Sequence, residues 1–318
     1  MATVLVLGGT GFVGAGVVRA LLGADHHVTV LNRGSHIIAN TRQLTADRND
    51  KDAICQSLSG QGFDAVVDTN AKTAAQAELL IEALGGRTGR VVVISSGSVY
   101  SDDAIQPPRE DQPAEGASVW GPYGLGKVGV EAAYRAAANR FDYCAIVRPP
   151  YIFGPGNSGD RETWFWTRQL AGRPLLLPGD GETRAHFVHN DDLAAALVML
   201  ACGERVGFDV FNVADPQMLN FADLAELLAD VAGVEQKAVR LGSIADDVPA
   251  RSWFPFRNYP CLCDPARILS ETSWRPGAGL RERFAATLAE YSPDMLVAAY
   301  KPTEAEVQLL ERTAAEVR

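Results

Sequence analysis

The sequence contains no run of 18 or more apolar residues, so we expect no membrane-spanning helix. Its start, Met1-Ala2-Thr3, leads directly into an apolar run without a basic segment or a cleavage site, so we expect a cytoplasmic protein. Basic residues are outnumbered, because 29 Lys and Arg stand against 39 Asp and Glu and give a net charge of −10. Nucleic-acid phosphates are bound by basic surfaces, so we expect no nucleic-acid partner.

Cysteines are few and show no pairing pattern. Their number is odd and they are scattered, at Cys55, Cys144, Cys202, Cys261 and Cys263. This distribution is typical of reduced thiols rather than of a disulfide framework. Cys261 and Cys263 have no second Cys pair and no neighbouring His, so the sequence predicts no metal site.

Apolar residues make up 47% of the 318 residues, which is enough for a large core in one domain or in two closely joined domains. Short apolar runs predict buried strands at residues 3–7, 27–31, 63–68, 90–95, 142–147 and 208–213. Apolar residues at helical spacing predict a helix at residues 12–22. Further helices are expected at residues 74–84, at the alanine-rich residues 127–139, and at residues 191–202. This alternation predicts an α/β fold of the Rossmann type, with a doubly wound parallel sheet covered on both faces.

The sequence changes in texture after Pro150. Residues 151–160 and 172–184 are rich in Gly and Pro, and residues 240–279 are irregular. Asn220 is expected to cap a helix at 221–232, and two last helices are expected at about 280–290 and 303–316. We predict a dinucleotide-binding domain over residues 1–155 that also receives about 186–213. Residues 156–185 and 214–318 would form a smaller C-terminal substrate lobe.

Three glycines stand between the first expected strand and the first expected helix. Gly8, Gly11 and Gly14 follow one another in the order G-x-x-G-x-x-G. A backbone without Cβ atoms lets a pyrophosphate approach, and the helix N-terminus offers unpaired N–H groups and a partial positive charge. The strand before and the helix after indicate a dinucleotide site. A tight strand-to-helix turn without a ligand is the alternative.

The end of the second expected strand bears on the choice of cofactor. An acidic residue there would bind the ribose hydroxyls of NAD, but this chain has Asn32-Arg33. Asn32 removes the charge that would repel a 2′-phosphate, and Arg33 can pair with such a phosphate. The sequence therefore favours NADP over NAD. A solvated surface arginine is the alternative interpretation of Arg33.

Tyr123 and Lys127 are four residues apart, so on a helix they lie on the same face. The unperturbed pKa of tyrosine is about 10, so a tyrosine that exchanges protons near neutrality needs a nearby cation. We expect the Lys127 ammonium to stabilise the Tyr123 phenolate, and Ser96, at a strand end, to hydrogen-bond the reacting oxygen. A chance pair on an exposed helix face is the alternative.

Together these motifs resemble those of the extended short-chain dehydrogenases/reductases of the NAD-dependent epimerase/dehydratase type. Besides the glycine loop and the Tyr123/Lys127 pair, three further segments resemble family motifs, namely residues 95–100, 148–157 and 187–194. The resemblance covers about residues 3–215. It implies an NAD(P)-dependent enzyme with a small-molecule substrate and a homodimeric state.

The resemblance also implies roles for individual residues. Asp47 and Arg48 occupy the segment that usually flanks the adenine, and Asn70 and Ala71 occupy a segment that lines the cofactor. The expected catalytic residues are Ser96, Tyr123 and Lys127. The expected cofactor-binding residues are Gly8, Thr10, Gly11, Phe12, Val13, Gly14, Asn32, Arg33, Asp47, Arg48, Asn70, Ala71, Lys127 and Pro150.

Departures from the family patterns narrow the expected chemistry. Gly97-Ser98 stands where the sugar 4,6-dehydratases carry an Asp-Glu pair, so dehydration is not expected. Asn32-Arg33 stands where many C4 epimerases carry an acidic residue, which favours the NADP-using reductases of the family. The expected substrate-binding residues are Ser98, Asn157, Arg184 and Arg251. Either an aromatic wall for the substrate or packing of the lobe would explain Trp120, Tyr151, Trp164 and Trp166.

The sequence therefore predicts an NAD(P)-dependent oxidoreductase or epimerase. Its target would be a carbinol or carbonyl carbon of a nucleotide sugar or a related small metabolite. One alternative is an NADPH-dependent ketoreductase of a specialised metabolite. The other is a non-catalytic family member that binds NADP or associates with RNA.

Overall fold

The computed structural model describes residues 1–34 and 36–316, which form two compact units. Unit 1 consists of Met1–Pro150, Asn190–Pro216 and Cys263–Pro276. Unit 2 consists of Tyr151–His189, Gln217–Leu262 and the chain from Gly277 onward. The chain therefore passes between the units more than once.

Unit 1 contains a seven-stranded sheet in the order β10-β6-β5-β4-β1-β2-β3, in which all neighbouring strands are parallel. The strands are β1 (Thr3–Leu7), β2 (His27–Asn32), β3 (Arg42–Thr45), β4 (Phe63–Asp68), β5 (Thr88–Ile94), β6 (Tyr143–Arg148) and β10 (Gly207–Asn212). The central strands are apolar almost throughout because helices cover both faces of the sheet.

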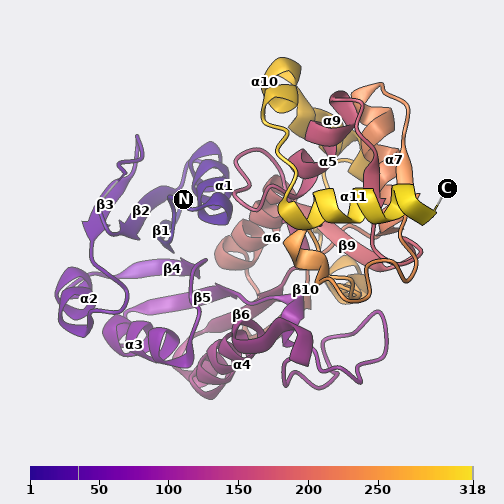
Figure 1. The fold of residues 1–318 in the computed structure, drawn as a ribbon. Coiled ribbons are helices and arrows are strands. Elements are labelled where there is room, and N and C mark those ends of the chain that lie inside the picture. The colour runs from indigo at the N-terminus through magenta and orange to yellow at the C-terminus, as the bar shows by residue number, and fades with distance from the viewer. Residues whose placement is uncertain (35, 317–318) are drawn as a thin grey trace. The chain divides into compact units, whose positions relative to one another are not determined.

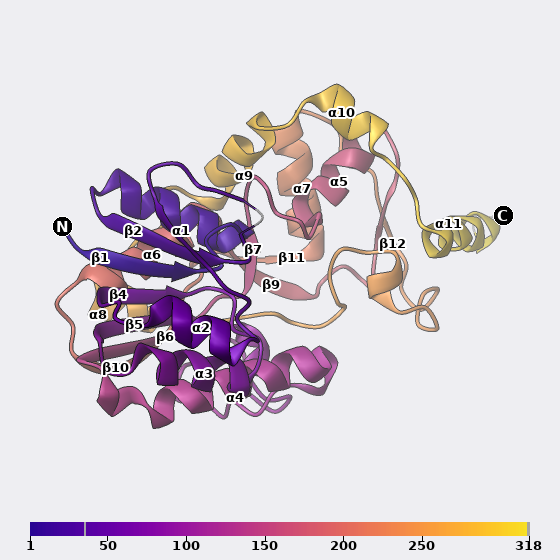
Figure 2. The ribbon, with the colours of Figure 1, turned by 90° about the vertical axis from the view of Figure 1, so that its left-hand side faces the viewer.

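The two faces are covered by different helices (Figure 1). Helices α1 (Phe12–Gly23) and α6 (Asn190–Cys202) pack together on one face. Helices α2 (Lys51–Leu58), α3 (Ala74–Leu84) and α4 (Gly121–Ala136) cover the other, as Figure 2 shows from a second side. The predicted α/β fold of the Rossmann type, with its doubly wound parallel sheet, is confirmed.

Strand β10 lies at one edge of this sheet, where its outer backbone groups need partners. The short helix α8 (Ala266–Glu271) supplies one of them, since Arg267 Nη1 donates to the carbonyl of Val210 at 2.8 Å. Arg267 Nη2 also donates to Asp209 at 3.0 Å. Charged side chains on an edge strand discourage pairing with another chain.

Helix α4 differs from its predicted bounds, because it runs from Gly121 to Ala136 rather than over 127–139. Gly124 and Gly126 lower the helix propensity of its first turns. Both glycines are instead needed for close packing. A Cβ atom on Gly124 would lie 2.8 Å from the carbonyl oxygen of Ser98, and one on Gly126 would run into the carbonyl oxygen of Lys72. Tertiary packing outweighs local propensity here, and Tyr123 becomes part of the helix.

Unit 2 combines helices with two small sheets. Its helices are α5 (Arg161–Leu170), α7 (Phe221–Ala232), α9 (Leu280–Ala289), α10 (Pro293–Ala298) and α11 (Glu304–Glu316). One sheet has the order β11-β9-β7, with β7 (Tyr151–Phe153), β9 (Arg184–His189) and β11 (Met218–Asn220). The other pairs β8 (Leu175–Leu177) with β12 (Ala238–Arg240). Asn220 caps α7 as predicted, its side chain accepting from the amide of Asp223 at 2.7 Å.

Aromatic side chains form the core of unit 2. Phe153 stacks on Phe284 with ring centroids 4.0 Å apart, and Phe221 stacks on Phe256. Trp166 is fully buried and donates from Nε1 to the carbonyl of Leu228 at 3.2 Å, so this tryptophan serves core packing.

Over the described part of the chain, no helix has both the length and the apolar character that a membrane span requires.

Candidate active site

In the glycine loop between β1 and α1, neither Gly8 nor Gly14 has room for a Cβ atom. Gly8 has φ +78°, a backbone conformation that favours glycine, and its carbonyl accepts from the amide of Gly11 at 2.9 Å. A Cβ atom on Gly14 would clash with this same carbonyl. Gly11 caps α1 without a side-chain hydrogen bond, so the first N–H groups of the helix are left for a ligand.

A cavity of about 370 Å³ opens at this loop. Among its lining residues are eight of the predicted cofactor contacts: Gly8, Thr10, Gly11, Asn32, Arg33, Asp47, Arg48 and Asn70. Phe12, Val13 and Gly14 form the first turn of α1 beside it. Cavity size, glycine cradle and uncapped helix N-terminus together fit a dinucleotide.

Asn32 and Arg33 differ in what they contact. The Asn32 amide shapes its own loop, because Oδ1 accepts from the Gly34 amide at 2.7 Å and Nδ2 donates to the His36 carbonyl at 3.2 Å. Arg33 is exposed and makes no hydrogen bond or ion pair with the described residues. Its guanidinium is therefore available to a ligand in the cavity.

Arg48 lines the same cavity, but its guanidinium turns to the protein interior. Nη1 and Nη2 donate to the two carboxylate oxygens of Asp68 at 2.8 and 3.0 Å, and Nη1 also donates to Asn70 Oδ1. Asp68 is fully buried at the end of β4. Burial is the largest single influence and would raise its pKa, but the charge of Arg48 and the hydrogen bonds from Arg48, Tyr134 and Asn70 together hold the Asp68 pKa below its usual range.

Lys127 is buried in α4, with its ammonium between two strand ends. Nζ donates to the carbonyls of Ala71 and Ile94, each at 2.8 Å. An ammonium has three donors, so one remains for a ligand. Burial lowers the pKa of Lys127 from 10.5 to about 8, although the negative charge of Asp68 opposes this shift. Ala71, a predicted cofactor residue, is fully buried and contributes its backbone carbonyl.

Tyr123 lies one turn before Lys127 in the same helix, and about half of the residue's surface is exposed (52%). The close approach of Gly124 to Ser98 brings this end of α4 against the short 3₁₀ helix η1 (Gly97–Val99). Ser96 caps η1, its Oγ accepting from the Ser98 amide at 3.2 Å. The Ser96 hydroxyl hydrogen is thus left to donate elsewhere.

Two more predicted residues lie near this strand end. Ser98 is buried, and its Oγ has no hydrogen-bond partner among the described residues. Pro150 is buried next to Pro149, whose carbonyl accepts from the Gly97 amide at 2.8 Å. The end of β5, the start of α4 and the end of β6 therefore meet around η1.

The remaining predicted substrate contacts belong to unit 2. Asn157 is committed to its own loop, where Nδ2 donates to Glu162 Oε2 at 3.2 Å and Oδ1 accepts from the Gly159 amide. Arg184 is exposed at the start of β9. Arg251 donates from Nη1 to the carbonyls of Phe254 and Pro255.

Arg251 is part of an arginine cluster formed by Arg161, Arg251 and Arg257 around Tyr151. The guanidinium of Arg161 lies 5.0 Å from the centroid of the Tyr151 ring. Burial, followed by the charges of Arg161 and Arg257, lowers the pKa of Arg251. Neither Arg161 nor Arg251 forms an ion pair within the described residues. Like charges held together in this way favour an anionic ligand.

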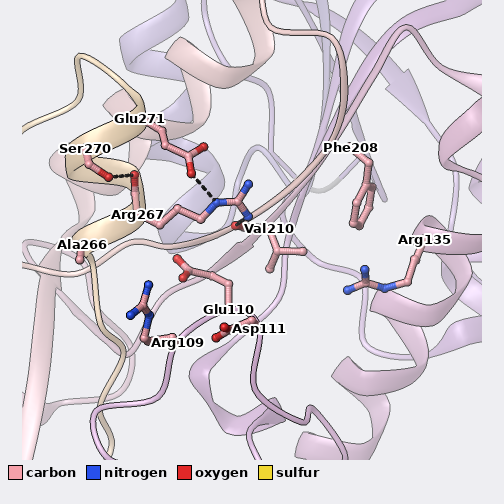
Figure 3. A pocket seen from close by; sticks show the side chains of 10 residues that line it. All are labelled: Arg109, Glu110, Asp111, Arg135, Phe208, Val210, Ala266, Arg267, Ser270 and Glu271. Atoms are coloured by element: carbon pink, nitrogen blue, oxygen red, sulfur yellow. Dashed lines mark hydrogen bonds and ion pairs between the residues drawn. The ribbon is translucent and has the colours of Figure 1, made fainter.

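A larger cavity, of about 550 Å³, lies beside the edge strand β10 and contains none of the predicted site residues (Figure 3). Arg267 and Glu271 of α8 form an ion pair in its wall. Glu110 lies beside Arg267 in this wall, and its Oε1 accepts from the backbone N–H of Asn212 at 2.7 Å. These charges serve each other and the sheet edge, so the larger cavity is not the candidate active site.

Several residues of the cavity in unit 1 and of the arginine cluster in unit 2 were not predicted from the sequence. Asn49, Lys72 and Gln76 line the smaller cavity, Asp68 lies behind it, and Arg161 and Arg257 join the arginine cluster. The rule that ligands bind at the carboxyl ends of parallel strands could have indicated Asp68 and Lys72. Within the described residues, no group of three or more His, Cys, Asp or Glu is arranged to hold a metal ion.

A parallel sheet with a glycine cradle at the carboxyl end of its first strand defines a dinucleotide-binding protein of the Rossmann class. The chain matches the NAD dependent epimerase/dehydratase family over residues 4–214, and it belongs to this family. The resemblance seen in the motifs, and with it the predicted class of NAD-dependent enzyme, is confirmed at the level of the family.

Individual relatives differ in what their names describe. The chain is 29% identical over 296 residues to the chloroplast stem-loop binding protein of 41 kDa b of Arabidopsis thaliana, covering 88% of this chain and 76% of that protein. It is 33% identical over 238 residues to 2′-dehydrokanamycin reductase of Streptomyces kanamyceticus, covering 72% and 66%. A solved UDP-glucose 4-epimerase of Thermotoga maritima has the same fold, with a TM-score of 0.75 and 19% identity over 90% of this chain and 97% of that one.

Proposed function

We propose that the protein is an NADP-dependent oxidoreductase that interconverts a carbonyl and a carbinol group of a small anionic metabolite. The observation that carries the proposal is the Lys127 ammonium. It is held by two backbone carbonyls beside the glycine cradle and lies one helical turn from a half-exposed tyrosine. A nicotinamide dinucleotide bound at the cradle would supply or accept the hydride.

Residues of the chain would transfer the proton and orient the substrate oxygen. In the direction of reduction, the Tyr123 hydroxyl gives its proton to the substrate oxygen as the carbonyl becomes a carbinol. The resulting phenolate is stabilised by the positive charge of Lys127 and regains a proton from solvent. Ser96 donates a hydrogen bond to the same substrate oxygen and orients it. An epimerase would use the same residues twice on one carbon.

The proposed cofactor and substrate class rest on the positive charges of unit 1 and unit 2. Arg33 would pair with the 2′-phosphate of NADP, and Lys72 adds a second positive charge to the cavity. In unit 2, the clustered charges of Arg161, Arg251 and Arg257 would favour an anionic ligand, such as the diphosphate of a nucleotide sugar. Asn157 is less suited to this role because its amide is already used within its loop.

Replacement of Tyr123 tests the mechanism. We expect Tyr123→Phe to bind NADP as the unchanged protein does and to lose at least about a hundredfold in turnover of any accepted substrate, since only the proton donor is removed. Binding is measured by the shift in melting temperature with NADP, and turnover by absorbance of the reduced cofactor. Tyr300→Phe, which alters a half-exposed tyrosine in unit 2, is the matched control. Turnover that survives in Tyr123→Phe contradicts the mechanism.

A stem-loop-binding function is the second candidate, favoured by the Arabidopsis relative. The net charge of −10 argues against it, because binding to nucleic acid needs positive charge that releases counterions. We expect no retention of an RNA hairpin in a filter-binding assay at low salt. Tight, salt-sensitive retention, unaffected by Tyr123→Phe, would instead favour a binding protein.

A further inference from the structure

The buried ion pair Arg48–Asp68 lies behind the wall of the cofactor cavity. Asp68 ends β4 in register with Leu7 of β1 and Val93 of β5. Besides the two hydrogen bonds from Arg48, the Asp68 carboxylate accepts from the Tyr134 hydroxyl at 2.9 Å and from the backbone N–H of Asn70 at 3.3 Å. All of these donors come from different segments of unit 1, so the carboxylate is a point where the segments meet.

The pair connects two loops of the cavity wall. Arg48 belongs to the loop after β3, and its guanidinium also donates to the Asn70 side chain and to the carbonyl of Gln76 at 3.4 Å. Asn70 directly precedes Ala71, whose carbonyl accepts from Lys127 Nζ. A shift of the loop after β4 would therefore move one of the two carbonyls that hold the ammonium.

Four charged groups act on the Lys127 ammonium through space. Asp68 from β4 and Glu131 from α4 favour the charged form, whereas Arg48 and Lys72 oppose it. The favourable action of Asp68 is the largest of the four and exceeds that of Arg48. On balance the ion pair therefore favours the charged form of Lys127 and offsets part of the effect of burial on its pKa.

We infer that Asp68 is a positioning residue for Lys127. Through Arg48 and Asn70 it holds the Ala71 carbonyl against the ammonium, and it places a negative charge where it acts favourably on that ammonium. The inference rests on the proposed role of Lys127 and adds a carboxylate that lies outside the cofactor loop and the Tyr/Lys pair. A purely structural ion pair would affect folding stability without changing the titration of Lys127 selectively.

The chain offers a direct measurement, because it contains few lysines: Lys51, Lys72, Lys127, Lys237 and Lys301. Protein labelled with ¹³C at the lysine ε carbon gives a separate NMR signal for each, and Lys127→Met assigns the relevant one. In the unchanged protein without cofactor we expect the Lys127 signal to titrate near pH 8.

Two variants change the pair in different ways. Asp68→Asn removes the favourable charge and leaves Arg48 unpaired, so the Lys127 midpoint should fall by about 1 pH unit or more. Arg48→Met/Asp68→Asn removes both charges, and its midpoint should lie between those of Asp68→Asn and the unchanged protein. Asp64→Asn is the matched control, since it neutralises a carboxylate at the other end of β4 that bonds to Thr3.

The order of the Lys127 titration midpoints in these variants tests the inference. A Lys127 midpoint that stays within about 0.3 pH units in both variants, or that moves equally in Asp64→Asn, overturns it. If Asp68→Asn does not fold, the double variant carries the test, because it leaves no buried unpaired charge. The titration needs neither cofactor nor substrate, so its failure is distinct from the failure of Tyr123→Phe to lose turnover.

Discussion

At the scale of single residues, the chain separates charges that serve the protein from charges that are open to a ligand. Arg48 forms an ion pair with the buried Asp68, and Arg148 forms one with the buried Glu131. Among the residues that the structure describes, Arg33 has no buried carboxylate partner of this kind, although it lines the same cavity as Arg48. The sequence alone made Arg33 and Arg48 candidates for binding the cofactor, and only their contacts in the structure distinguish the two.

Arg33 gives a prediction about cofactor choice. Arg33→Ala should weaken NADP binding at least about tenfold, because a charged hydrogen-bonding partner of the 2′-phosphate is lost. NAD binding should change far less, since NAD has no such phosphate. Dissociation constants from calorimetry at fixed salt provide the measurement. Arg42→Ala is the control, because Arg42 is exposed on the neighbouring β3 and bonds to Gln61. Equal losses for both cofactors would remove the basis for the NADP preference.

At the scale of secondary-structure elements, strands were easier to predict than the helix that carries the proposed catalytic pair Tyr123 and Lys127. Buried parallel strands appear in a sequence as continuous apolar runs, which makes their ends easy to recognise. The predicted bounds of β1 and β4 are confirmed. The start of α4 was predicted wrongly because its glycines disfavour a helix in isolation. Strand β3 and helix α2 were not predicted, since they are short and partly exposed.

The glycines of α4 give the prediction at this scale. Gly126→Ala should destabilise the protein by about 1–3 kcal/mol, since its Cβ atom meets the Lys72 backbone and the helix must move. The same movement would displace Lys127, so turnover should fall as well. Gly23→Ala, at the end of α1, has open space around its Cβ atom and should leave both quantities nearly unchanged. Urea unfolding and turnover assays measure the two effects; equal stability of the two variants would contradict the packing argument.

At the scale of the whole molecule, the two units rely on different interactions. Unit 1 is organised by the backbone ladder of its seven-stranded sheet, whereas unit 2 is organised by aromatic packing and a buried ion pair. In that pair, Arg168 of α5 donates to Glu306 of α11 at 2.9 and 2.5 Å, and both side chains are almost fully buried. Leu309 of α11 is fully buried too, so the last helix is part of the unit.

Glu306 gives a prediction about how this helix is held. Glu306→Ala leaves the buried Arg168 without its partner and should destabilise unit 2 by about 3 kcal/mol or more. Glu304→Ala, in the same first turn but exposed, should have little effect. Denaturant unfolding measures stability, and limited proteolysis reports whether α11 is released. Similar behaviour of the two variants would show that the ion pair does not anchor α11.

The homodimer implied by the family resemblance stays a prediction, and sedimentation at several protein concentrations would check it. The NADP preference and the assignment of Ser96, Tyr123 and Lys127 are proposals with the tests given above.

The sequence by itself determined the class of fold and the family, because apolar periodicity and glycine spacing are local signals that survive without knowledge of contacts. Only the tertiary structure decided that Arg48 faces Asp68, that two carbonyls hold Lys127, and that α4 begins before Tyr123. These outcomes depend on residues far apart in the chain. Their free energies come from burial, hydrogen bonds and charge pairing, which exist only once the strands and loops have been brought together.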